Sequence, residues 1–437
     1  MFKPACGNPV SILRRSCDFL SVLTIAAALV TPALAGTSLL TDKPDLSSFS
    51  QDDLNRVTDM LDREVGQGHL AGAIMLIQHR GKPVYYEAFG VRDPATMAPM
   101  TTDTIFRLYS MSKPVTSVAA MILVEQGKLR LDDPIAKFIP SFAHPQVATE
   151  RADASGKPYL DFAPAKKPIT VLDLMRQSSG ISSAFTNLGL ITQLYLDAGL
   201  FDGDFDNADF AARLAKLPLA YQPATVWDYG HSTDLLGRVI EIASGQSLYD
   251  FQRQYLFDPL GMTDTGYYVL DPAKAPRIAQ PMPTDRIIGN ETISDPTVKR
   301  RWESGGGGLV STTGDYARFL QMLINGGTLD GVRILKPESV QQMRQNQVAP
   351  ASDVKPWAYY YPGAGFGYGL GFGVRTGPGE DGVPGFIGEM AWGGAAGTYF
   401  WTYPDQDMVM ILMVQTPTQR GRIQPILKTL VYEAIKK

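Results

Sequence analysis

Ser110 and Lys113, which are three residues apart, are the side chains of this sequence best placed to do chemistry together. If the segment is helical, residues i and i+3 lie on one face, so the lysine amine can reach the serine hydroxyl. A serine hydroxyl is a weak nucleophile until a neighbouring base accepts its proton. The spacing therefore indicates covalent catalysis by serine, with lysine rather than histidine handling the proton.

The sequence after Lys113 supports a helix at this point. Residues 115–124 are almost entirely apolar, which is typical of a buried helix, and Gly127 can follow its last turn. Pro114 is tolerated only in a first turn, so the helix must begin near Ser110, where backbone N–H groups are free. The alternative is that Ser110 only caps the helix and that Lys113 follows by chance.

The same four-residue pattern occurs a second time, at Ser352 and Lys355. That copy lies in a Pro- and Tyr-rich stretch, residues 349–365, and no helical pattern follows it. We interpret it as a solvated loop. The pattern alone therefore does not identify a nucleophile, and the neighbouring sequence has to decide.

A second reactive side chain is Tyr229, in a loop that precedes an amphipathic segment beginning at Leu235. A tyrosine acts as a base only as phenolate, which a nearby cation such as Lys113 can stabilise. The alternative is an ordinary packed aromatic residue. His231 follows two residues later, and no acid is evidently placed to orient it. We therefore expect His231 to be a polar lining residue and not the base of a triad.

Small residues dominate a third stretch, residues 389–398, whose centre reads Trp392-Gly393-Gly394-Ala395. Small side chains at the edge of a strand leave backbone N–H groups accessible, as an oxyanion hole requires. A bulge or a tight turn between strands is the alternative interpretation.

Taken in order, the three stretches resemble the serine β-lactamase-like superfamily, and specifically the class C β-lactamases and the family VIII carboxylesterases. The resemblance covers nearly all of residues 50–437. It is specific for the superfamily and much less so for the substrate. The further segments that carry it are Phe106-Arg107-Leu108, Leu131-Asp132-Asp133-Pro134, Ser178-Ser179-Gly180, Leu235-Leu236-Gly237-Arg238, Pro259-Leu260-Gly261-Met262-Thr263-Asp264-Thr265 and Gly307-Gly308-Leu309-Val310-Ser311-Thr312.

The resemblance implies a role for each of the reactive residues. Ser110 would be the nucleophile and Lys113 its proton-handling partner. Tyr229 would be the base that completes proton transfer and later activates water. The oxyanion hole would consist of the backbone N–H groups of Ser110 and Ala395.

Two departures from the class C β-lactamases bear on the substrate. Those enzymes carry Lys-Thr-Gly where this chain has Trp392, Gly393 and Gly394, so the cation that would pair with a β-lactam carboxylate is absent. They also carry Asn at the position of His231. We expect these four residues to contact the substrate. Losing one charged contact costs about 1.5–3 kcal/mol, and the Trp-Gly-Gly form resembles the esterases.

We therefore expect an exported serine hydrolase that cleaves small-molecule carboxylic esters through an acyl-enzyme on Ser110. A β-lactamase or a D-amino-acid peptidase of the same fold, which would act on an amide, is the first alternative. A penicillin- or peptide-binding sensor without turnover is the second. Acyl transfer to an alcohol or amine is a further variant.

The N-terminus has the features of a cleaved signal peptide. A basic segment ending in Arg14-Arg15 precedes a short apolar run, residues 19–30, and Ala33-Leu34-Ala35 offers a cleavage site. We expect a periplasmic or secreted mature chain that begins near Gly36 and has no membrane span. An uncleaved membrane anchor is the alternative.

Composition narrows the class of function. Both cysteines, Cys6 and Cys17, lie in the expected signal peptide, so the mature chain would have neither disulfides nor cysteine catalysis. The four histidines form no metal-binding pattern, and we expect neither a metal site nor a cofactor. A net charge of −4 without a basic run argues against nucleic acid as a partner.

The elements that must position the reactive residues begin at the two ends of the chain. Before Ser110, we expect a helix capped by Ser50 and a β-hairpin of two strands. After residue 364, alternating glycine and apolar residues predict a strand over 365–374, and further strands and a last helix follow. The other expected elements are strands at 73–79, 83–89, 399–403 and 408–415, and helices over 54–65, 169–175, 235–243 and 423–435.

Strands at both ends around a helical middle predict an α/β fold of the α+β type. One antiparallel sheet would be built from both chain ends and flanked by helices, with a mostly helical region inserted between them. The expected divisions are a signal peptide (1–35), a linker (36–48) and one hydrolase domain (49–437), whose α/β part is about 49–125 and 365–437 and whose helical part is about 126–364.

Overall fold

A computed structural model describes residues 48–184, 189–286, 294–348, 365–378 and 382–436. These belong to the unit that spans Ser38–Lys437. The expected signal peptide and its cleavage site lie outside the described residues, as does the second Ser-x-x-Lys copy at 352–355. No helix in the described part of the chain has the length and apolarity needed to cross a bilayer.

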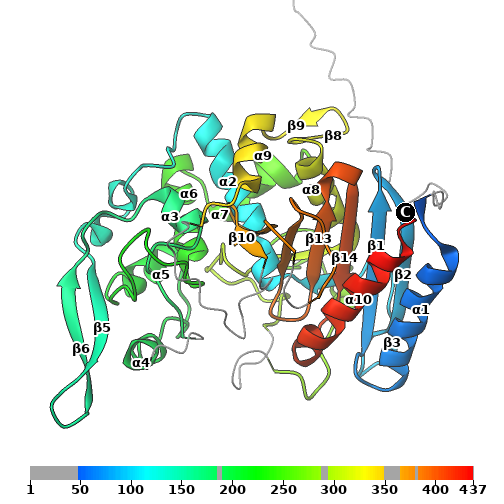
Figure 1. The fold of residues 1–437 in the computed structure, drawn as a ribbon, viewed down its shortest axis with the longest axis horizontal. Coiled ribbons are helices and arrows are strands. Elements are labelled where there is room, and N and C mark those ends of the chain that lie inside the picture. Colours follow the sequence, from blue (N-terminus) through cyan, green and yellow to red (C-terminus); the bar gives the residue numbers. More distant parts are fainter. Residues whose placement is uncertain (1–47, 185–188, 287–293, 349–364, 379–381, 437) are drawn as a thin grey trace, which may run out of the picture. The chain divides into compact units, whose positions relative to one another are not determined.

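One antiparallel sheet assembled from both ends of the chain is the central element, as predicted (Figure 1). Its eight strands lie in the order β10-β11-β12-β13-β14-β1-β2-β3. The two ends meet where β1 pairs with β14, from Ile74 opposite Met413 to His79 opposite Met408. The strands are β1 (Gly72–His79), β2 (Lys82–Asp93), β3 (Ala98–Pro99), β10 (Phe366–Tyr368), β11 (Gly373–Arg375), β12 (Met390–Gly393), β13 (Tyr399–Tyr403) and β14 (Met408–Met413).

Helices cover both faces of this sheet, and the alternation of side chains along β1 shows why. All eight residues of β1 are buried. Ile74 and Leu76 belong to the core under α2 and α8, whereas Met75 and Ile77 belong to a second core under α1 and α10. Successive side chains of a strand point to opposite faces, so one apolar strand serves two cores. The helices are α1 (Gln51–Gly66), α2 (Ser112–Glu125), α8 (Thr313–Ile324) and α10 (Arg420–Ala434).

The helix expected after Ser110 is confirmed. A 3₁₀ turn over Tyr109–Met111 leads into α2, with Pro114 in the first turn. Every α2 residue from Ser112 to Leu123 is buried. Gly127 adopts a positive φ of 70° beyond the last turn, as expected of a glycine that ends a helix.

The strand expected over 365–374 is instead two short strands, β10 and β11, joined by a turn. The Gly369 N–H donates to the Phe372 carbonyl at 2.8 Å, and Gly371 has a φ of +100°. A Cβ at Gly371 would lie 2.4 Å from Ser117 Oγ, so the turn packs directly on α2. The glycines allow a close approach of the backbone, as the sequence indicated. The approach occurs where the chain reverses direction and packs on α2, and not along a continuous strand.

The regular elements of the inserted region are mainly helices, with two short two-stranded sheets in its described residues, in which β5 pairs with β6 and β8 with β9. A third pair, β4 with β7, joins the segment before Ser110 to this region. The helices are α3 (Val171–Met175), α4 (Leu190–Asp197), α5 (Asn207–Leu214), α6 (Ser232–Ser244), α7 (Leu248–Gln252) and α9 (Pro337–Arg344), and the strands are β4 (Ile105–Arg107), β5 (Gln146–Ala152), β6 (Pro158–Pro164), β7 (Val310–Thr312), β8 (Thr328–Leu329) and β9 (Val332–Arg333).

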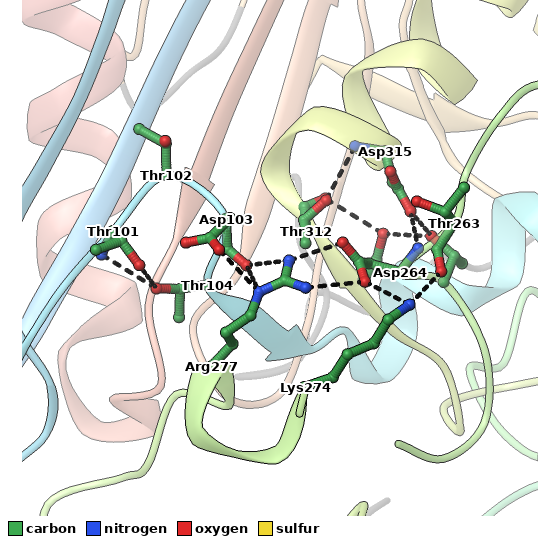
Figure 2. A network of polar contacts seen from close by, with 12 residues as sticks. Thr101, Thr102, Asp103, Thr104, Thr263, Asp264, Lys274, Arg277, Thr312 and Asp315 are labelled. Atoms are coloured by element: carbon green, nitrogen blue, oxygen red, sulfur yellow. Dashed lines mark hydrogen bonds and ion pairs between the residues drawn. The ribbon is translucent and has the colours of Figure 1, made fainter. Parts of the chain in front are cut away.

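A polar network joins the segment before β4 and the segment around Asp264 and Arg277 to the start of α8 (Figure 2). Asp315, in the first turn of α8, accepts hydrogen bonds from the Asp264 N–H at 2.8 Å and the Thr265 hydroxyl at 2.9 Å. Arg277 pairs with Asp264 at 2.7 Å and with Asp103 at 2.9 Å. Burial raises the pKa of Asp315 to about 6 despite these bonds. The network ties three separate chain segments together.

Candidate active site

Ser110 stands at a strained entry to the buried helix α2. Tyr109, immediately before it, has a φ of +46°, which a residue with a side chain rarely adopts. Such a backbone conformation costs about 1–3 kcal/mol and persists only where the surroundings enforce it. Here β4 is fixed by β7 on one side and α2 is buried on the other. The turn between them therefore holds the hydroxyl at a defined place.

The Lys113 side chain is buried and lies between the two other predicted catalytic residues. Its Nζ atom donates to the Gly306 carbonyl at 2.7 Å and to Ser110 Oγ at 3.4 Å. The same atom lies 4.6 Å from the centre of the Tyr229 ring. The structure thus brings Ser110, Lys113 and Tyr229 together, as expected. An amine in this position can exchange a proton with the hydroxyl and attract a phenolate.

Tyr229 is placed by a tight backbone crossing and by two tryptophans. A Cβ on the next residue, Gly230, would come within 2.6 Å of the Ser182 carbonyl oxygen, so the Tyr229 loop lies directly on the segment after α3. The Trp227 ring stacks on Tyr229 with centroids 5.9 Å apart, and the Trp392 ring lies 5.3 Å away on a different element.

Trp392 also contacts Tyr229 through a hydrogen bond. Its Nε1–H donates to the Tyr229 hydroxyl oxygen at 3.3 Å. A donor to this oxygen stabilises the phenolate relative to the phenol. We predicted Trp392 as a substrate contact, and the structure gives it a further contact with the expected base.

The end of β12 lies against the segment that precedes Ser110. β11 pairs with Met390 and Ala391, whereas the register with β13 continues to Gly393. A Cβ at Gly394 would lie 2.3 Å from the Leu108 carbonyl oxygen, so only glycine fits there. This close packing places the start of the next turn, at Ala395, and Ser110 on one cavity.

The expectation that no acid orients His231 is wrong. His231 Nδ1 lies 3.2 Å from Asp234 Oδ2, and both side chains are buried. The sequence contained a signal for this contact. His231 immediately precedes α6, and Asp234 follows three residues later, a spacing that places two side chains on one face of a helix. The rings of Phe201 and Phe210 contact the imidazole edge to face, at 5.6 and 5.4 Å.

Asp234 is a buried carboxylate that sequence reasoning missed. Its Oδ1 atom accepts hydrogen bonds from Ser304 Oγ at 2.5 Å and from the Gly306 N–H at 3.1 Å. Burial by itself would raise the pKa of Asp234, but the hydrogen bond of His231, the attraction of His231 and Lys113, and the Ser304 hydroxyl together hold that pKa below its ordinary value. An ionised carboxylate only accepts, so His231 Nδ1 carries the shared hydrogen.

One cavity of about 1540 Å³ connects these groups. Its walls combine the polar groups described above with aromatic side chains, a composition typical of small-molecule sites. Among the described residues, no group of three or more His, Cys, Asp or Glu side chains could hold a metal ion. The predicted site residues that line the cavity are Ser110, Lys113, Tyr229, His231, Trp392, Gly393, Gly394 and Ala395.

A family model described as Beta-lactamase matches residues 57–432. The chain belongs to the Beta-lactamase family. The resemblance inferred from the three motifs is therefore confirmed, and so is the fold class.

The chain is also similar to two known proteins and to one solved structure. Protein Rv1367c of Mycobacterium tuberculosis (strain ATCC 25618 / H37Rv) is 34% identical over 361 residues, which cover 80% of this chain and 86% of the relative. Esterase EstB of Burkholderia gladioli is 27% identical over 410 residues, which cover 87% of this chain and 96% of EstB. The structure of EstCE1, described as a hydrolase with promiscuous acyltransferase activity, matches with a TM-score of 0.72 and 25% identity, covering 87% of this chain and 99% of EstCE1.

The hydrogen bond from Trp392 gives a first prediction for this member of the Beta-lactamase family. Trp392→Phe keeps an aromatic ring but removes the N–H donor to Tyr229. We expect kcat/KM for p-nitrophenyl butyrate to fall about 10- to 150-fold, because a hydrogen bond to a charged group contributes about 1.5–3 kcal/mol. Trp401→Phe, on the neighbouring strand β13, is the control, because that indole is buried away from Tyr229. Equal kcat/KM for the Trp392 variant and the wild type would refute the role.

A second prediction concerns Asp228, the buried residue next to Tyr229. Burial raises the pKa of Asp228 to about 7, although a hydrogen bond with Ser182 lowers it in part. The folded state therefore binds this proton more tightly than the unfolded chain does, and the stabilisation is lost as the pH rises from about 4 towards 7.

Asp228→Asn, which stays neutral, should therefore be more stable than the wild type at pH 8, by about 1–3 kcal/mol, and show no such gain at pH 4. Urea unfolding at both pH values measures the difference. The exposed Asp62→Asn serves as the control. A gain that is the same at both pH values would contradict the prediction.

Proposed function

We propose that this protein hydrolyses carboxylic esters through an acyl-enzyme on Ser110. The observation that carries the proposal is the hydrogen bond from Trp392 Nε1 to the Tyr229 hydroxyl. A class C β-lactamase has a lysine at this position, whereas the indole is neutral and directs its N–H at the expected base. The name of EstB as an esterase and the description of EstCE1 as a hydrolase support the same reaction class.

In the acylation step, Ser110 Oγ attacks the carbonyl carbon of the ester. The hydroxyl proton passes to Lys113, whose Nζ atom is 3.4 Å away. The negative charge that forms on the carbonyl oxygen is stabilised by the backbone N–H groups of Ser110 and Ala395. The C–O bond to the leaving group then breaks, and the alcohol departs with a proton delivered by way of Tyr229.

In the deacylation step, water on the Tyr229 side attacks the acyl-enzyme. Tyr229 accepts the proton of the water and is assisted by the Lys113 amine above its ring. The bond to Ser110 Oγ breaks, the serine regains a proton, and the carboxylic acid is released. Trp392, Gly393, Gly394 and His231 line the side of the cavity where the substrate binds.

Acyl transfer is the second candidate reaction. It uses the same acyl-enzyme, but an alcohol takes the place of water and a new ester forms. EstCE1, whose description includes promiscuous acyltransferase activity, is the observation that favours it. Product analysis with and without an added alcohol separates the two outcomes.

Ser110→Ala gives the direct test of the proposed nucleophile. We expect kcat/KM for p-nitrophenyl butyrate to fall about 10³-fold or more, because the variant lacks the hydroxyl on which the proposed acyl-enzyme forms. Ser352→Ala, at the second Ser-x-x-Lys copy, is the matched control and should keep wild-type activity. Full activity of the Ser110 variant would rule out the mechanism.

The same samples separate the alternative functions. Rapid turnover of nitrocefin at low concentration would favour a β-lactamase over an esterase. A lasting adduct on Ser110, observed by intact mass after addition of ester, would favour a sensor without turnover, whereas a transient adduct is expected of the hydrolase.

We also propose that the protein is exported, on the basis of the predicted signal peptide in residues 1–35. The mass of the protein recovered from a bacterial periplasm or culture medium should correspond to a chain that begins at Gly36. A recovered chain that retains Met1 would contradict cleavage.

A further inference from the structure

Gly306 joins the Asp234 carboxylate to the Lys113 amine. The Gly306 N–H donates to Asp234 Oδ1 at 3.1 Å, and the Gly306 carbonyl accepts from Lys113 Nζ at 2.7 Å. The Ser304 hydroxyl donates to the same carboxylate oxygen. The position of the amine beside Ser110 therefore depends on a loop that Asp234 holds from the other side.

The loop that contains Gly305 and Gly306 is tightly packed on both sides. Thr116, on α2, donates its hydroxyl to the Gly305 carbonyl at 2.7 Å. A Cβ at Gly305 would lie 2.7 Å from the Thr233 carbonyl oxygen, and one at Gly306 would lie 2.8 Å from Asp234 Oδ2. The loop is thus packed between α6, which carries Asp234, and α2, which carries Lys113.

The Asp234 and Lys113 side chains also attract each other electrostatically. Both are buried, and attraction to Lys113 is one of the causes that hold the pKa of Asp234 below its ordinary value. In a buried site such an attraction is weakly screened. When Lys113 accepts the Ser110 proton, the ammonium that forms lies near a carboxylate that is already ionised.

We propose that Asp234 is a positioning residue for the reaction: it fixes the Gly306 carbonyl that anchors Lys113, and its negative charge attracts the amine that receives the Ser110 proton. The inference rests on the proposed function of Ser110 and Lys113 as nucleophile and proton acceptor. Asp234 acts through Gly306 and need not touch the substrate. Its partner His231 is held by the other carboxylate oxygen and so keeps its place in the cavity wall.

The test measures Ser110 directly, without turnover. A fluorophosphonate labels the serine irreversibly, and intact mass gives the second-order rate constant as a function of pH. Asp234→Asn keeps the size of the side chain and one acceptor oxygen but removes the charge. We expect the plateau rate to fall about 10-fold and the pH of half-maximal labelling on the acid side to fall by about one unit, because a lysine without a neighbouring negative charge releases its proton more readily but is a weaker base.

Asp315→Asn is the matched control. Asp315 is likewise a buried acid in the first turn of a helix, but its partners are Thr265 and Asp264, in the network of Figure 2. This variant should keep the wild-type rate and pH profile. A loss as large as that of Asp234→Asn, or an Asp234→Asn profile identical to the wild type, would overturn the proposal.

A second variant tests the proposal independently, in case the Asp234→Asn protein does not fold. Ser304→Ala removes one hydrogen bond to the carboxylate and keeps the charge, so labelling should slow about 3- to 10-fold with the pH of half-maximal labelling unchanged. A wild-type rate for this variant would overturn the proposal by itself. If the fluorophosphonate labels Ser110 of the wild type but the protein hydrolyses no ester, the proposed function is refuted. The labelling rates of the variants would still test the positioning role of Asp234.

Discussion

The site depends on a buried lysine amine. Removing an ammonium from water is costly unless polar partners replace the water, so Lys113 can occupy the interior only where partners are fixed in advance. The Gly306 carbonyl, the Ser110 hydroxyl and the face of the Tyr229 ring supply those partners. Each comes from a different part of the chain. The fold therefore has to hold three distant segments around one nitrogen atom.

Three parts of the chain divide this task. The N-terminal part supplies α2 and the strained Tyr109 turn, and the inserted region supplies Tyr229 and the Gly306 loop. The C-terminal part adds β12, which lies in the same sheet because β14 pairs with β1. Every residue of β1, at the centre of the sheet, is buried, so these segments are joined through a strand that is packed on both faces. Strain at Tyr109 can persist because both flanking elements are fixed.

Trp392 shows how a single position can alter the chemistry of a shared fold. An indole in place of a lysine removes a cation from the substrate side and adds a neutral donor to the Tyr229 oxygen. Lys113, whose amine lies 4.6 Å from the centre of the Tyr229 ring, supplies positive charge next to the base. An uncharged wall at this point suits a neutral ester better than an anionic lactam.

The sequence by itself determined the elements whose signals are local. Pro114 placed the start of α2, and β-rich runs predicted β1, β2, β13 and β14. The motifs also pointed to Ser110, Lys113 and Tyr229, which the structure brings together. The alternating residues 365–374 predicted one strand, whereas β10 and β11 form a hairpin. The turn between them packs on α2, which is distant in the sequence, so the local pattern did not reveal it. Sequence reasoning also missed Asp234 and the Gly306 carbonyl. Their roles arise from hydrogen bonds between residues about 70 and 190 positions apart in the chain, and only tertiary packing decides which buried polar groups meet.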